Sequence, residues 1–138
     1  MPVLDIKLSR IIQLLGQKIS VDELEEILFR MGFEIETKEE KNGEIFLKIE
    51  ITPDRPDMLS SYGFVRALKK YMLLSPGLDK YPLKYDPKYK IHVDKSVAEV
   101  RPYIAATVVK RVKISEDDLD DLISVSYTHL TLPTTERV

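Results

Sequence analysis

The fold is decided by the stretch NGEIFLKIEITPDRPDMLSSYGFVRALKKY, residues 42–71, which changes its apolar period halfway along. Before the proline-containing centre, every second residue is apolar, which predicts a half-buried strand. After the centre, apolar residues recur at helical spacing and predict a helix over about residues 58–73. The strand positions are Ile45, Leu47, Ile49 and Ile51, and the helix positions are Phe64, Val65, Leu68, Tyr71 and Met72. The sequence therefore predicts a strand and a helix joined by a stiff corner.

The corner itself carries charged and polar residues whose role has to be weighed. Pro53 and Pro56 fix their own φ angles and favour extended backbone at the residues before them. Either Asp57 or Ser60 can cap the incoming helix. Gly63 costs a helix about 1 kcal/mol relative to alanine, which indicates a close backbone approach.

A catalytic loop, a metal site and a structural corner are three readings of this stretch. Catalysis needs converging partner residues, and the sequence offers none that can be named. We interpret Arg55, Asp57, Ser60 and Gly63 as a structural corner, in which Arg55 bridges carboxylates or carbonyl oxygens.

Upstream of residue 42, the sequence predicts two helices and the first strand of a hairpin. Leu8, Ile11, Ile12 and Leu15 form one apolar stripe that ends at Gly16. Ser20 and Glu23 have the spacing of a capping box, and the second helix ends at Gly32. Asn42-Gly43 is a two-residue hairpin signal between strand-like runs. Residues 1–75 are therefore predicted to be an α+β domain of helices plus a β-hairpin, with a winged-helix-like arrangement.

Downstream, the proline-rich residues 76–89 are predicted to be a linker. The runs YKIHVD and YIAATVVKRVKI have the composition of strands, and Ser115 is placed to cap an acidic helix. Residues 90–125 are thus expected to begin a second α/β module. Residues 126–138 do not continue that helix, because they are rich in threonine and contain Pro133. They resemble translated vector sequence, so we treat them as a non-native tail.

Composition excludes several classes of function. The chain has 138 residues and a net charge of −2, which argues against a strong positive potential for nucleic acids. It has no cysteine, which excludes disulfides and thiolate metal sites. No run of apolar residues is long enough for a membrane span or a signal peptide. Phosphate-binding glycine motifs and the H-E-x-x-H metal motif are missing from the sequence. We therefore expect a cytoplasmic protein that binds neither DNA nor membranes, with no catalytic, cofactor or metal residue in this chain.

One basic segment is a candidate surface for RNA. Lysines outnumber acidic residues between positions 69 and 90, and three tyrosines lie among them. Lysines contact phosphates and tyrosines stack on unpaired bases. The alternative is an ordinary solvated lysine surface. The candidate RNA-facing residues are Lys69, Lys70, Lys84 and Lys88.

Three separated stretches resemble one protein family. Residues 1–36, 42–71 and 91–125 are similar, in order and spacing, to the beginning of the phenylalanyl-tRNA synthetase (phenylalanine-tRNA ligase) beta subunit of the archaeal and eukaryotic cytosolic type. Asp54 replaces the asparagine that is usual in the family. The resemblance covers residues 1–125 and implies that this chain is an N-terminal fragment of such a subunit.

The resemblance also implies what the whole enzyme does. It is a class II aminoacyl-tRNA synthetase, an alpha2-beta2 heterotetramer that attaches phenylalanine to tRNA(Phe) using ATP and magnesium. Its aminoacylation site lies in the alpha subunit, and its editing pocket lies in a tRNA-editing module of which residues 90–125 would be the truncated start. A later domain of the beta subunit has a similar fold and helps to hold magnesium. Aligning its motif on Asp57 places Gly63, Arg66 and Ala67 where that domain has further acidic residues, so magnesium binding is not carried over.

Two functional hypotheses follow. The first is an assembly and candidate RNA-contacting module of this ligase, inactive alone. The second is a stand-alone winged-helix nucleic-acid-binding or adaptor domain. The helix over residues 21–31 offers only Arg30 among several glutamates, which disfavours DNA phosphates.

Overall fold

The structure is a computed structural model that describes residues 2–100 and 102–126. The described chain forms two compact units: residues up to Gly77 join the segment from Ser115 onward, and Leu78–Ile114 form the other. The predicted division into residues 1–75, 76–89, 90–125 and 126–138 stays a prediction. The first unit has the predicted α+β character, with helices on one three-stranded antiparallel sheet.

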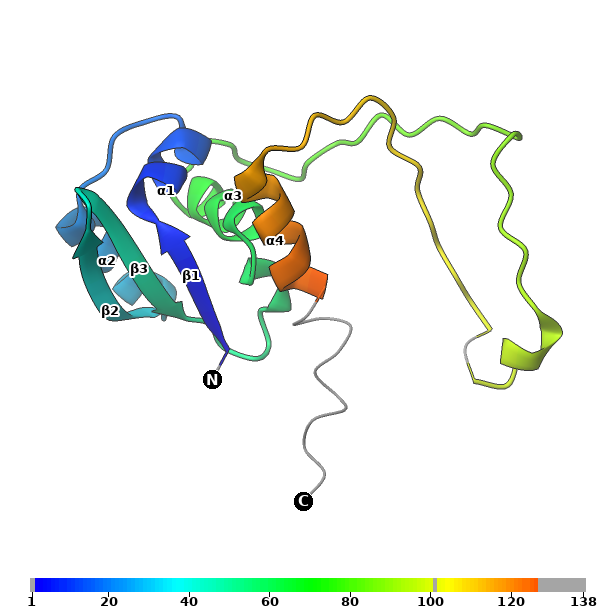
Figure 1. Ribbon diagram of the computed structural model, residues 1–138, viewed down its shortest axis with the longest axis horizontal. Coiled ribbons are helices and arrows are strands. Elements are labelled where there is room, and N and C mark those ends of the chain that lie inside the picture. Colours follow the sequence, from blue (N-terminus) through cyan, green and yellow to red (C-terminus); the bar gives the residue numbers. More distant parts are fainter. Residues whose placement is uncertain (1, 101, 127–138) are drawn as a thin grey trace, which may run out of the picture. The chain divides into compact units, whose positions relative to one another are not determined.

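The sheet has the order β1-β3-β2, with β1 at Val3–Lys7, β2 at Glu34–Lys41 and β3 at Glu44–Glu50 (Figure 1). The hairpin β2–β3 is confirmed, and Asn42 and Gly43 both have positive φ, at 54° and 77°. Positive φ at both central residues is the geometry of a type I′ turn. The sequence does not predict strand β1, because Ile6 and Lys7 begin the run IKLSRIIQLLG (6–16), whose apolar spacing predicts the first helix. It pairs with β3, placing Leu4 opposite Ile49 and Ile6 opposite Leu47.

One face of this sheet is buried and the other is exposed. Alternate residues of β1 and β3 face the core, whereas Asp5 and Lys48 between them are exposed. Helix α1 packs on β3 and on α3, and α2 packs on β2. The core therefore lies between the sheet and the helices, and it includes Leu4, Ile6, Ile11, Leu24, Leu28, Leu47, Ile49, Ile51, Met58, Phe64 and Leu68.

Local sequence signals set the bounds of the first two helices, α1 at Leu8–Leu15 and α2 at Val21–Met31. Helix α1 ends at Gly16, which has a φ of 83° that only glycine adopts readily. The Ser20 hydroxyl oxygen accepts a hydrogen bond from the Glu23 amide, as the capping box predicts. The predicted starts and ends of these helices are thus confirmed, apart from the two residues lost to β1.

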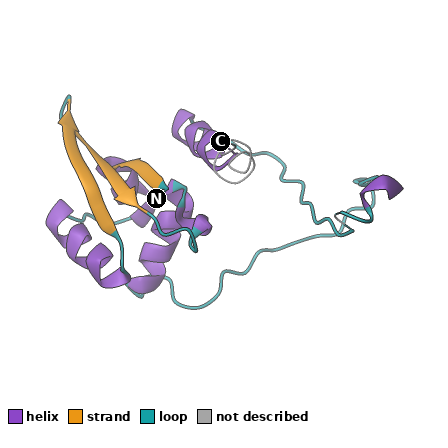
Figure 2. Cartoon of the chain, turned by 90° about the horizontal axis from the view of Figure 1, so that it is seen from below, coloured by secondary structure: helices purple, strands orange, loops and turns teal. Residues whose placement is uncertain are grey.

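The second unit corrects one expectation. The runs YKIHVD (89–94) and YIAATVVKRVKI (103–114) are predicted to be strands, but the described part of Leu78–Ile114 is loop, apart from the short 3-10 turn η2 at Lys95–Val97 (Figure 2). A strand is stabilised by pairing, and these residues have no paired neighbour within the described chain. The apolar side chains of the two runs, including Ile91, Ile104 and Val109, are exposed.

Helix α4 at Glu116–Ser126 is confirmed as an acidic helix that begins after Ser115. Ser115 Oγ accepts from the Asp118 amide at 3.2 Å, and the Ser115 amide donates to Asp118 Oδ2 at 3.0 Å. This reciprocal pair is a capping box. Ser126, the first residue of the predicted tail, is the last residue of α4, so the prediction that the helix stops before it is wrong by one residue, and the rest of the tail lies outside the described residues. Among the residues described, no helix has both the length and the apolar character needed to cross a bilayer.

Candidate functional site

The candidate site is the corner between β3 and α3, where the chain turns at Arg55 and enters the 3-10 turn η1 at Pro56–Met58. Arg55 holds Asp57 with two parallel hydrogen bonds, Nε to Oδ1 and NH2 to Oδ2, both 3.0 Å long. Two backbone bonds tighten the turn, from the Arg55 amide to the Thr52 carbonyl oxygen and from the Met58 amide to the Arg55 carbonyl oxygen. The side chains of Arg55 and Asp57 form a bidentate pair at the surface.

Helix α3, at Ser61–Tyr71, begins later than predicted and is capped by Ser60. Ser60 Oγ accepts from the Gly63 amide at 3.1 Å. Of the two candidate caps, Ser60 takes this position, while the carboxylate of Asp57 is engaged by Arg55. Met58 and Leu59, between them, are buried in the core, so the corner is anchored from within.

Gly63 lies against the backbone of the corner. A Cβ atom at this position would stand 1.8 Å from the Asp57 carbonyl oxygen and 3.0 Å from its carbonyl carbon. The opposing atoms are backbone and cannot rotate away. The close approach predicted from the helical glycine is therefore present, and it brings all four corner residues together.

The electrostatics of the corner favour an ion pair. The hydrogen bond from Arg55 lowers the pKa of Asp57, and the same bond raises the pKa of Arg55. Magnesium prefers several oxygen ligands in octahedral geometry, whereas this carboxylate already accepts both of its bonds from a guanidinium. No cluster of three or more histidine and acidic side chains fit for a metal occurs in the described part of the chain. The residues of the corner do not fit magnesium.

Comparison with known proteins shows the family of the chain that contains this corner. Residues 1–73 match the model of the Phe-tRNA synthetase beta subunit B1 domain. The chain belongs to this family. Residues 42–71 lie wholly within the matched region, so the corner is part of the B1 domain itself.

Similar proteins extend the likeness beyond the B1 domain. The phenylalanine–tRNA ligase beta subunit of Aeropyrum pernix is 39% identical over 123 residues, which is 89% of this chain and 21% of that protein. That of Methanosphaera stadtmanae is 32% identical over 123 residues, again 89% and 21%. A crystal structure of an N-terminal fragment of the Pyrococcus horikoshii beta subunit matches with a TM-score of 0.79 and 27% identity, over 92% of this chain and 37% of that one. The chain thus spans about a fifth of the length of these curated relatives.

The candidate RNA-facing lysines come from both units. Lys69 and Lys70 lie in the last turn of α3, and Lys70 Nζ is 3.5 Å from Ser75 Oγ. Lys84 and Lys88 belong to the second unit and are exposed. Each pair can be tested by itself, and the role of these lysines stays a prediction.

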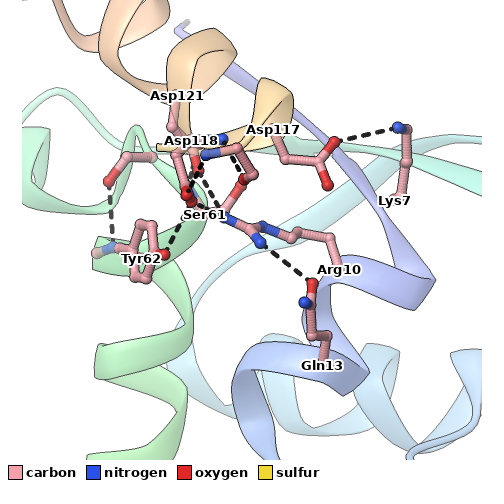
Figure 3. A network of polar contacts seen from close by, with 11 residues as sticks. Lys7, Arg10, Gln13, Ser61, Tyr62, Asp117, Asp118 and Asp121 are labelled. Atoms are coloured by element: carbon pink, nitrogen blue, oxygen red, sulfur yellow. Dashed lines mark hydrogen bonds and ion pairs between the residues drawn. The ribbon is translucent and has the colours of Figure 1, made fainter. Parts of the chain in front are cut away.

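A polar network on the B1 domain was missed by the sequence analysis (Figure 3). It joins Arg10 of α1 and Tyr62 of α3 to Asp118 and Asp121 of α4. The signals were an arginine within the apolar pattern of α1 and the acidic run SEDDLDDLI. Neither feature indicates the residue it contacts, because Arg10 and Asp118 lie 108 positions apart in the sequence.

Proposed function

We propose that this chain is the N-terminal part of a beta subunit that works with an alpha subunit as phenylalanine–tRNA ligase, joining phenylalanine to tRNA(Phe) with ATP and magnesium. The single observation that carries the proposal is the match of residues 1–73 to the B1 domain. The relatives' names support the ligase activity for the longer protein. We further propose the class II alpha2-beta2 assembly and a cytoplasmic location.

Within this enzyme, we assign the chain a role in assembly. The Asp57 carboxylate at the corner is paired with Arg55 through two hydrogen bonds. A carboxylate that is paired in this way is a poor ligand for magnesium. Acyl transfer would also require a nucleophile or base close to a pocket. The ATP, the magnesium and the reacting groups then belong to other parts of the complex, and this chain's residues supply a rigid platform.

The alternative is a free-standing nucleic-acid-binding or adaptor domain. Arg30, the candidate phosphate contact on α2, is paired with Glu26 on the same helix. Glu25 on this helix pairs with Lys38 of β2. Because these cations are paired with carboxylates, the surface of α2 has little positive potential to attract the phosphates of DNA.

The test is phenylalanine charging of tRNA(Phe), measured on three preparations. These are the isolated chain, the full-length beta subunit with the alpha subunit, and the same complex without residues 1–77. We expect charging by the full complex and none by the isolated chain. In the truncated complex, the fraction that is assembled, measured by its mass in solution, should fall by the same factor as the charging activity. Charging by the isolated chain, or a full complex with no charging activity, would overturn the proposal.

The RNA contact is tested separately in the full complex. Replacing Lys84 and Lys88 with alanine should raise the KM for tRNA and leave the KM for phenylalanine unchanged, because phosphate contacts contribute only to RNA binding. Lys48→Ala, on the exposed face of β3, is the matched control. An unchanged KM for tRNA in the double variant shows an ordinary lysine surface.

A further inference from the structure

Helix α4 contacts the N-terminal domain through largely buried carboxylates, whereas the apolar residues of its stripe stay about half exposed. Leu119, Leu122 and Ile123 form an i, i+3, i+4 stripe, yet they are 50%, 53% and 48% exposed. The side chains of Asp118 and Asp121, one turn apart, are only 21% and 13% exposed. An amphipathic helix normally buries its apolar stripe. Something other than apolar burial therefore holds this helix in place.

The surface that receives the two carboxylates is built from three groups on the N-terminal domain (Figure 3). Arg10 NH2 donates to Asp118 Oδ1 at 2.6 Å and lies 3.7 Å from Asp121 Oδ2. The Tyr62 hydroxyl donates to Asp118 Oδ1 at 2.8 Å, and the Ser61 amide donates to Asp121 Oδ1 at 2.9 Å. The Arg10 guanidinium also lies over the Tyr62 ring, 5.2 Å from its centre.

Each of these groups is suited to a carboxylate. The side chain of Arg10 is only 8% exposed, and a buried guanidinium is costly unless it is paired. Gln13 Oε1 accepts a single bond from NH1, which leaves the charge to be met by Asp118 and Asp121. Ser61 is the first residue of α3, so its backbone amide has no partner within the helix and lies at the positive end of the helix dipole.

We propose that Arg10, Tyr62 and the Ser61 amide form an interaction surface that recognises an acidic helix, and that its partner is α4 of the same chain. Two carboxylates three positions apart on one helical face match the three donor groups of the surface, because Arg10 and Tyr62 donate to Asp118 and the Ser61 amide donates to Asp121. A smaller contact, between Lys7 Nζ and Asp117 at 3.4 Å, flanks the pair. The surface ties the chain back to the N-terminal domain after the loop of Leu78–Ile114, by charge and not by apolar burial.

The docking can be measured on the whole chain by the distance between two spin labels. The chain has no cysteine, so Asp22→Cys on α2 and Asp120→Cys on α4, both exposed positions, supply the only thiols. We expect one narrow distance distribution in low salt. Raising the salt to about 1 M, where the Debye length is about 3 Å, should reduce the narrow population by about half, because salt favours the separated charges.

Variants decide whether the charges are the cause. Asp118→Asn with Asp121→Asn should broaden the distribution even in low salt and leave the melting of the domain core intact. Arg10→Gln should do the same, while Arg30→Gln, which removes the exposed pair with Glu26, is the matched control. If Arg10→Gln does not fold, the double variant on α4 still gives the answer. A narrow distribution in that double variant, or release of α4 by Leu119→Ser and Leu122→Ser instead, would overturn the proposal.

Discussion

The carbonyl oxygen of Asp57 lies 1.8 Å from the point where a Cβ atom on Gly63 would stand, so helix α3 can reach the corner only with glycine at this position. This contact joins the two ends of the corner through backbone atoms. Gly63 therefore has a packing role and not a hinge role, since its own φ is not among the positive values of the chain.

Gly63→Ala should lower the free energy of unfolding by more than about 2 kcal/mol, because the new methyl group overlaps fixed backbone. Without that overlap, the higher helix propensity of alanine would raise stability by about 1 kcal/mol. The sign of the change in chemical denaturation thus decides the matter. Arg66→Ala, on the exposed side of the same helix, is the control and should change stability by less than about 0.5 kcal/mol.

Ser60→Ala should lower the free energy of unfolding by about 0.5 to 2 kcal/mol, because it removes the acceptor for the Gly63 amide. Ser60→Asp keeps a capping oxygen and should recover most of this loss. Urea unfolding of the three proteins checks the prediction. Equal midpoints for parent and Ser60→Ala would show that the cap contributes nothing.

The ion pair of the corner should depend on pH in one direction. Arg55 lowers the pKa of Asp57 in the folded chain, so the pair contributes stability above the ordinary aspartate value of about 4 and loses it as pH falls through the lower folded value. Both side chains are about two-fifths exposed, which limits the contribution to about 0 to 1 kcal/mol. The stability difference between parent and Asp57→Asn should shrink from pH 7 to pH 3, and a difference that grows would contradict this sign.

The parts of the fold that could be predicted are those with signals local in sequence. Ser20, Gly16 and Gly32 set helix ends through bonds within a few residues, and Asn42-Gly43 sets the hairpin by its own backbone angles. A glycine within the helix at position 63 indicates a close approach to another backbone, although it does not identify the opposing atom. Each of these signals lies within about one turn of the element that it controls.

The parts that failed depend on distant partners. Strand β1 is only five residues long and is defined by its pairing with β3, whose partner residues lie 39 to 47 positions away. The apolar run at 103–114 has strand composition, but composition does not supply a paired neighbour. The contact of Arg10 with Asp118 was likewise hidden, since an arginine within an apolar stripe has many candidate partners along the chain.

That the β3–α3 corner is structural, and neither a metal site nor a catalytic site, is tested most directly by thermal melting of the parent chain and Asp57→Ala, each with and without millimolar magnesium. The ion pair predicts a slightly lower Tm for Asp57→Ala and no effect of magnesium on either protein. A metal site would instead raise the Tm of the parent in magnesium by mass action, and Asp57→Ala would abolish that rise. A magnesium-dependent increase confined to the parent would contradict the structural assignment.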